Sequence, residues 1–147
     1  MRGGGGGSGD AGRTPFTSAK PIYLQILDDV CRRIARGDLG PGERLQSVRD
    51  SALAHGVNPN TMQRVHEALE RLGVTETRRG QGTFVTAAPA KIRALRSRLL
   101  REAVAAFGED MVRLGVPKPE VLQALEQWWA TSAGRGAGQG TERGSTQ

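Results

Sequence analysis

Apolar residues recur every three or four positions in the first patterned stretch of the chain, residues 21–36. This spacing predicts an amphipathic helix that begins near Pro21 and ends at Gly37. Cys31 lies within the apolar stripe, so we expect a small core residue rather than a reactive thiol. The stripe consists of Ile22, Ile26, Val30 and Ile34, flanked by Tyr23, Leu27 and Cys31.

Two further helices are predicted to follow the LGPGE turn. Ser47 is a suitable N-cap for a short helix that ends near His55 and is closed by Gly56. Asn58 caps the next helix, residues 59–72, with Pro59 at its first position. Its apolar face consists of Met62, Val65, Leu69 and Leu72. Two helices joined by a tight glycine-containing turn indicate a helix-turn-helix.

Residues 74–86, VTETRRGQGTFVT, alternate in the manner of two short strands. Gly80 and Gly82 suit the positive φ angles of a hairpin turn between them. Three helices followed by a hairpin predict a mainly α fold with a small β-hairpin wing, that is, a winged helix-turn-helix.

A third patterned region begins at Lys91, and its apolar positions recur over about six turns to Leu114. LGVPKPE interrupts the pattern, and a shorter helix follows. Two such helices leave their apolar stripes uncovered, which predicts a C-terminal dimerisation element that pairs with a second copy. We expect the tryptophans to make core or dimer contacts rather than to stack a ligand. The predicted dimerisation residues are Leu95, Leu99, Phe107, Met111, Leu114, Leu125, Trp128 and Trp129.

These patterns divide the chain into four segments: a disordered Gly-rich tail (1–19), a winged helix-turn-helix domain (20–88), a helical dimerisation element (89–131) and a second disordered tail (132–147).

The net charge of +6 favours an anionic partner, with nucleic acid ahead of a membrane surface. Residues 20–86 hold 10 Lys or Arg against 8 Asp or Glu, counted along the sequence. A nucleic-acid footprint therefore depends on where the arginines lie. The N-terminus lacks a signal-like apolar region and no run is long enough to span a bilayer, so we expect a cytoplasmic protein without a membrane partner.

The start of the predicted helix 59–72 carries side chains suited to DNA bases. Recognition helices contact base edges through their N-terminal residues, and Asn, Gln and Arg pair bidentately with adenine or guanine. The helix N-terminus is also expected to offer N–H groups to a phosphate. Each residue has a simpler alternative, since Asn58 is a cap in any case and Asn60 and Gln63 suit a solvated surface. The predicted DNA-binding residues are Arg49, Asn58, Pro59, Asn60, Thr61, Gln63, Arg64, Arg78, Arg79 and Gly80.

No combination of residues indicates catalysis. His55 and His66 lie eleven positions apart without a cysteine or paired carboxylates at ligand spacing, so no metal site is predicted. We expect no cofactor and no enzymatic activity.

The elements GDLGPGERLQSVR, GVNPNTMQRV and TRRGQGTFV occur in this order, and the sequence resembles GntR-family transcriptional regulators over about residues 20–131. The short two-helix tail is similar to the YtrA-type subfamily. The resemblance implies a dimerising tail with little or no effector domain, and repression of operons, often of transporters. It places DNA contacts at Arg49, Asn58, Pro59, Asn60, Thr61, Gln63, Arg79 and Gly80. The sequence departs from the family at Gln46, where proline is usual, and at Ser51 and His55, where leucine is usual.

We therefore predict a homodimeric DNA-binding regulator, a repressor by resemblance, that recognises an inverted-repeat operator on double-stranded DNA. A small-molecule effector of unidentified structure is an additional candidate partner. The first alternative is a winged-helix protein-interaction module without sequence-specific DNA binding. The second is the DNA-binding part of an enzyme fusion, which would require several hundred more residues.

Overall fold

The computed structural model describes residues 20–136. Contacts divide this part of the chain into two units, residues 20–100 and 101–136. The first unit contains α1 (Ile22–Arg36), α2 (Val48–His55), α3 (Pro59–Arg71), β1 (Thr75–Arg78), β2 (Gly82–Val85) and the first turns of α4 (Pro89–Leu114). The second contains the remainder of α4 and α5 (Lys118–Gly136). The predicted class, helical with a two-stranded wing, is confirmed.

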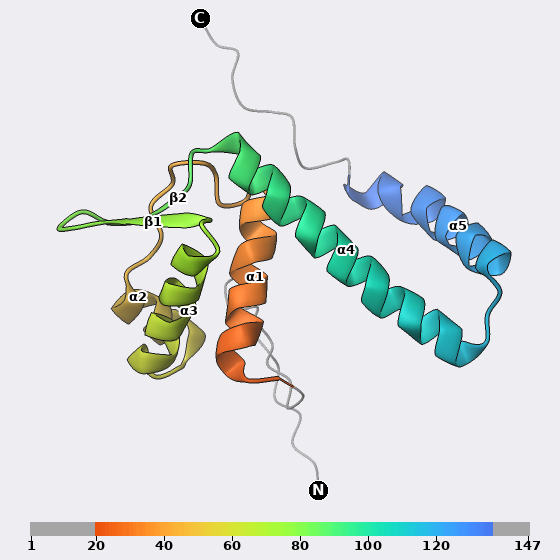
Figure 1. Cartoon of the computed structure of the whole chain (residues 1–147), viewed down its shortest axis with the longest axis horizontal. Coiled ribbons are helices and arrows are strands. Elements are labelled where there is room, and N and C mark those ends of the chain that lie inside the picture. Colours follow the sequence, from red (N-terminus) through yellow and green to blue (C-terminus); the bar gives the residue numbers. More distant parts are fainter. Residues whose placement is uncertain (1–19, 137–147) are drawn as a thin grey trace, which may run out of the picture. The chain divides into compact units, whose positions relative to one another are not determined.

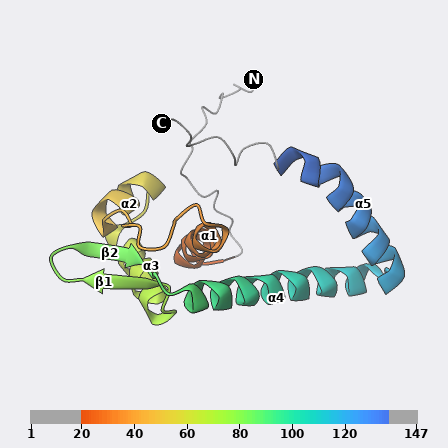
Figure 2. The same ribbon diagram turned by 90° about the horizontal axis from the view of Figure 1, so that it is seen from above.

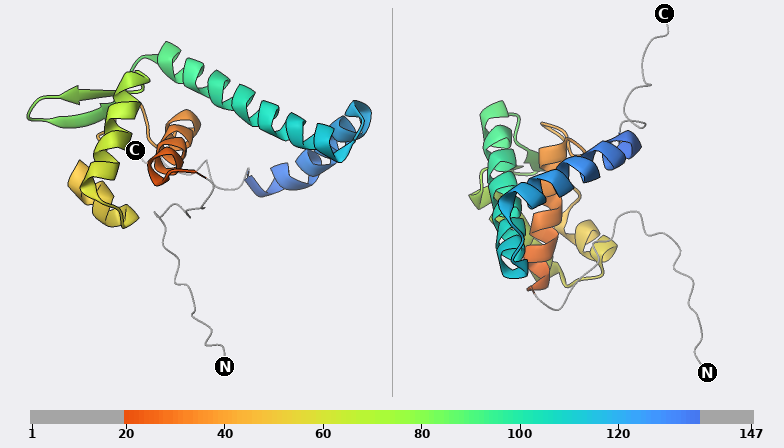
Figure 3. Two further views of the ribbon diagram at one scale, coloured as in Figure 1. Left: turned by 60° about the horizontal axis from the view of Figure 1, so that its bottom comes forward. Right: turned by 90° about the vertical axis from the view of Figure 1, so that its right-hand side faces the viewer.

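The core of the first unit lies between α1 and α3, which run side by side (Figures 1 and 3). Ile26 and Ile34 from α1 meet Met62, Val65 and Leu69 from α3, and all five side chains are buried. Burial of such side chains contributes about 1.5–3 kcal/mol each, relative to exposure. Cys31 is buried in the same cluster, so its predicted role as a core residue is confirmed.

The helix ends follow the local sequence closely. Ser47 Oγ accepts the N–H of Asp50 at 3.1 Å and caps α2, while Gly56 ends that helix with φ +66°. Pro21 is the N-cap of α1 rather than a residue of its first turn, because its ψ of 140° is not helical. Gly37 closes the same helix with φ +89°, a conformation that costs glycine little.

The wing is an antiparallel hairpin in which Thr75 pairs with Val85 and Arg78 pairs with Gly82. Figure 2 shows β1 and β2 side by side, joined by a turn at their free end. A third segment completes the sheet, because Arg44 forms a β-bridge with Phe84. Backbone bonds of 2.8 Å flank the bridge, from Leu45 N–H to the Thr83 carbonyl and from Val85 N–H to the Glu43 carbonyl. The loop before α2 therefore acts as an additional strand.

The second unit consists of two helical segments joined by a short turn. Gly115 adopts φ +70°, and the N–H of Val116 bonds to the carbonyl of Met111 at 3.1 Å, which ends α4. α5 continues to Gly136, five residues beyond the predicted end of the dimerisation element. The predicted tail residues 1–19 and 137–147 lie outside the described residues. Every helix in residues 20–136 is too short or too polar to cross a lipid bilayer.

Candidate nucleic-acid interface

The start of α3 is capped by Asn58, as the sequence predicts. Asn58 Oδ1 accepts the N–H of Asn60 at 2.8 Å, and the Asn58 carbonyl accepts the N–H of Thr61 at 3.0 Å. Pro59 has no N–H, so these bonds use the N–H groups of the first turn. The expectation that this helix end offers free N–H groups to a phosphate is therefore wrong. The first N–H groups of α2, those of Val48 and Arg49, have no protein acceptor among the described residues.

The next residues of α3 divide between solvent and core. Asn60 and Gln63 are exposed and Thr61 is half-buried, while Met62 and Val65 face the core. Gln63 Nε2 donates to Glu67 Oε1 at 3.3 Å, one turn further along the helix. This bond is long and runs along the surface of the helix. The exposed polar edge of α3 is thus formed by Asn60, Thr61 and Gln63.

Arg64, also predicted to contact DNA, is exposed and contacts α1. Its guanidinium carbon is 3.9 Å from the centre of the Tyr23 ring, within the range of a cation–π contact. The contact joins α1 to α3. Arg64 therefore has a role in packing that its position in the sequence does not indicate.

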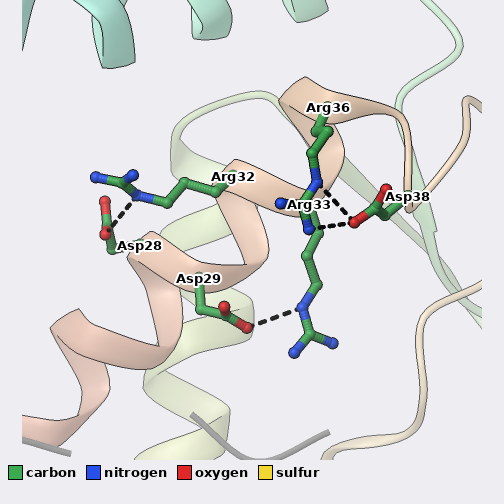
Figure 4. A network of polar contacts seen from close by, with 6 residues as sticks. All are labelled: Asp28, Asp29, Arg32, Arg33, Arg36 and Asp38. Carbon is green, nitrogen blue, oxygen red and sulfur yellow. Dashed lines mark hydrogen bonds and ion pairs between the residues drawn. The ribbon is translucent and has the colours of Figure 1, made fainter. Parts of the chain in front are cut away.

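Ion pairs distinguish the arginines of α1 from those that follow between α1 and the end of the wing. The arginines of α1 are paired with carboxylates, as Figure 4 shows. Arg32 Nε lies 2.9 Å from Asp28 Oδ2, and Arg33 Nε lies 2.9 Å from Asp29 Oδ2. Arg36 binds Asp38. Within residues 20–136, the arginines of the loop before α2, the helix-turn-helix and the wing form no ion pair with a carboxylate; these are Arg44, Arg49, Arg64, Arg71, Arg78 and Arg79. In the described part of the chain, cations that no carboxylate pairs therefore lie on the elements predicted to meet DNA and on the loop before α2, and also on the first turns of α4, at Arg93 and Arg96.

The wing holds Arg78 and Arg79 at its turn, followed by Gly80 with φ +74°. Arg79 and Gly80 are exposed, while the Arg78 guanidinium lies 4.4 Å from the centre of the Phe84 ring. Arg44 reaches the same sheet from the loop before α2. Sequence reasoning did not select Arg44, because a short loop after LGPGE carries no strand pattern.

A cavity of about 360 Å³ lies in the first unit between α1, α2, α3 and the loop before α2. Ser51, His55 and His66 line it. Ser51 and His55 stand at the two positions where the family resemblance leads us to expect leucine. His55 is buried, with 8 % of its surface exposed, and half-buried His66 has its pKa lowered by burial. Among the described residues, no group of three or more His, Cys, Asp or Glu is arranged to hold a metal ion.

The predicted dimerisation residues fall into two sets. Leu95 is 4 % exposed and belongs to the first unit's core, with Leu99 packed against that core. Both therefore stabilise the protomer itself. The other six lie in the second unit, where an open cavity of about 600 Å³ is lined by Phe107, Met111, Leu125 and Trp128. Exposed Leu114 and Trp129 extend the apolar surface of this unit.

Comparisons with known proteins agree with this architecture. The family described as "Bacterial regulatory proteins, gntR family" matches residues 22–85. The chain is 46 % identical over 111 residues to the uncharacterized HTH-type transcriptional regulator YhcF of Bacillus subtilis, covering 76 % of this chain and 92 % of YhcF. It is 41 % identical over 69 residues to the HTH-type transcriptional repressor YtrA of the same organism, covering 47 % of this chain and 53 % of YtrA.

Among solved structures, a GntR family transcriptional regulator from Listeria monocytogenes matches with a TM-score of 0.71 and 31 % identity. The match covers 76 % of this chain and 98 % of that chain. The similarity therefore extends beyond the winged domain into the helical C-terminal part. The relatives are transcriptional regulators, which favours DNA binding over the interaction-module alternative. The chain belongs to the GntR family and is a winged helix-turn-helix, DNA-binding transcriptional regulator.

Proposed function

We propose that the protein represses transcription by binding an inverted-repeat operator as a homodimer. The observation that carries the proposal is the polar edge of α3, exposed at Asn60 and Gln63 and half-buried at Thr61, with unpaired arginines on the neighbouring α2 and wing. A neutral, hydrogen-bonding edge with cations around it suits base contacts flanked by phosphate contacts.

In this proposal α3 enters the major groove by its N-terminal end. Asn60 and Gln63 pair with base edges, with adenine as the preferred bidentate partner, and the Thr61 methyl packs against a thymine methyl. Asn58 and Pro59 act through the backbone, because they set where the helix begins. Arg64 stabilises the packing of α3 against α1 through its contact with Tyr23.

Phosphate contacts come from the elements on either side of α3. Arg49 stands at the start of α2 beside two N–H groups without a protein acceptor, which suits a phosphate oxygen. Arg78, Arg79 and Gly80 bring the wing to the backbone or to an adjacent minor groove, where glycine permits close approach.

The uncovered apolar surface of the second unit supports the proposed homodimer. Trp128 and Trp129 are 58 % and 64 % exposed, and Phe107 lines the open cavity. Large exposed aromatic surfaces of this kind mark association sites. A two-fold symmetric pair presents two copies of α3 to half-sites one or more helical turns apart, about 34–36 Å per turn.

Repression is supported by the similarity to the YtrA repressor, of which the chain covers 53 %. The YtrA-type resemblance extends the proposal to a transporter operon as target, with a small-molecule effector of unidentified structure. DNA binding places the active protein in the cytoplasm with the chromosome.

The proposal is tested by footprinting the purified protein on its own promoter and on the promoters of neighbouring genes, with transcription measured on the same templates. We expect a protected inverted repeat and reduced transcription. Uniform, sequence-independent protection would contradict the operator, and increased transcription would contradict repression.

A further inference from the structure

We propose that Arg44 and Arg78 together form a phosphate-binding face on the wing, a second contact with the DNA backbone beside the turn at Arg79 and Gly80. The inference rests on the proposed function, because the ligand it assigns is the phosphodiester backbone of the bound DNA. It adds Arg44, which lies outside the helix-turn-helix and the hairpin in the sequence.

The sheet register places both arginines on one face of the wing. Arg44 is bridged to Phe84, and Arg78 is paired with Gly82. Paired residues of an antiparallel sheet project to the same side, and residues two apart on a strand share a face. Phe84 and Gly82 therefore lie on the same face of β2, with Arg44 on one side of the strand and Arg78 on the other.

The two guanidinium groups are held along this face. A Cβ atom at Gly82 would lie 2.7 Å from Arg44 Nε, so the Arg44 guanidinium covers the site where other residues would carry a side chain. The Arg78 guanidinium carbon lies 4.4 Å from the centre of the Phe84 ring. Both cations are thus positioned before any ligand binds, which lowers the entropic cost of binding one.

The charges around this face favour an anion at the end nearer the turn. Glu76 is the carboxylate of β1 on the same face, where it is paired with Phe84. It lies two residues further from the hairpin turn than Arg78. Within the described residues, Glu76 forms no ion pair with either arginine. The opposite face carries the hydroxyls of Thr77 and Thr83, 3.3 Å apart.

A phosphodiester suits this arrangement better than a base edge. Guanidinium groups bind phosphate oxygens through charge-assisted hydrogen bonds, and such contacts carry no sequence information. Arg44 should therefore contribute affinity and salt dependence, but no sequence selectivity.

The test compares wild-type protein with Arg44→Ala, Arg44→Lys and the control Arg32→Ala, whose partner Asp28 is on α1. Fluorescence anisotropy measures affinity for the protein's own promoter fragment and for a scrambled fragment, from about 50 to 300 mM NaCl. Circular dichroism verifies that each variant is folded.

We expect Arg44→Ala to weaken binding to both fragments by the same factor, roughly eightfold at 0.1 M salt, and to reduce the salt slope by about one. Arg44→Lys should keep the slope, and Arg32→Ala should match the wild type. If folded Arg44→Ala protein kept the wild-type salt slope and affinity, the inference would be overturned while the proposed function would stand. A loss of affinity confined to the promoter fragment would have the same consequence. A wild type without salt-dependent DNA binding would overturn the proposed function as well.

Discussion

The guanidinium carbon of Arg64 lies 3.9 Å from the centre of the Tyr23 ring, so a charged residue of α3 contacts α1. Gln63, its neighbour in the sequence, is exposed and bonded only along its own helix. Both side chains are exposed, but Arg64 contacts a neighbouring helix and Gln63 bonds only to its own helix.

Arg64→Ala should lower the free energy of unfolding by about 0.5–1 kcal/mol through loss of the cation–π contact. Gln63→Ala should leave it nearly unchanged and weaken operator binding instead. Urea denaturation and anisotropy titrations measure the two effects separately. If Arg64→Ala kept full stability but bound the operator tenfold more weakly, Arg64 would be a DNA contact rather than a packing residue.

Arg49→Ala should cost about 1–3 kcal/mol in operator binding, since Arg49 stands exposed at the start of α2 without a carboxylate partner. The Arg49→Lys variant distinguishes the two kinds of contact, because lysine replaces arginine at a phosphate better than at a bidentate base pairing. Gel-shift titrations on operator and scrambled DNA provide the comparison. Wild-type affinity in a folded Arg49→Ala protein would remove Arg49 from the interface.

His66 should make the first unit less stable in acid. Burial lowers its folded-state pKa below the ordinary value of 6.5. As the pH falls below ~6.5, the unfolded chain binds a proton more readily than the folded protein. Stability is therefore complete above this pH and declines from there toward the lower folded-state pKa.

Thermal denaturation between pH 7.5 and 5.5 should show a fall in Tm that becomes smaller in His66→Gln. His55 is the other histidine that lines this cavity, so His55→Gln serves as the matched control. The charged residues that line the cavity are Arg33, Glu43 and Arg44. A decline that persists in His66→Gln and disappears in His55→Gln would assign the effect to His55 instead.

Trp128→Ala should weaken self-association by about 2 kcal/mol, roughly thirtyfold in the dimer dissociation constant, because a large aromatic side chain lines the open cavity of the second unit. Gln127→Ala, an exposed polar neighbour, is the control. Sedimentation equilibrium measures both variants. A monomeric wild type, or equal association by Trp128→Ala, would contradict the proposed dimer surface.

The sequence alone was sufficient for features that depend on neighbouring residues. Asn58 with Pro59 marked the start of α3, and Gly80 with Gly82 marked the hairpin. Caps and positive-φ turns involve residues only a few positions apart, so their signals are local. The order of three helices and a hairpin then indicated the fold and, with it, the elements predicted to meet DNA.

Tertiary structure decided the roles that depend on distant partners. Tyr23 and Arg64, like Arg44 and Phe84, are separated by about forty residues in the sequence and meet only when the helices and sheet pack. Leu95 fits a continuous apolar stripe, yet it is buried in the first unit's core. A periodic pattern shows that a face is apolar but not which surface covers it, because burial depends on the packing of segments that the local sequence does not specify.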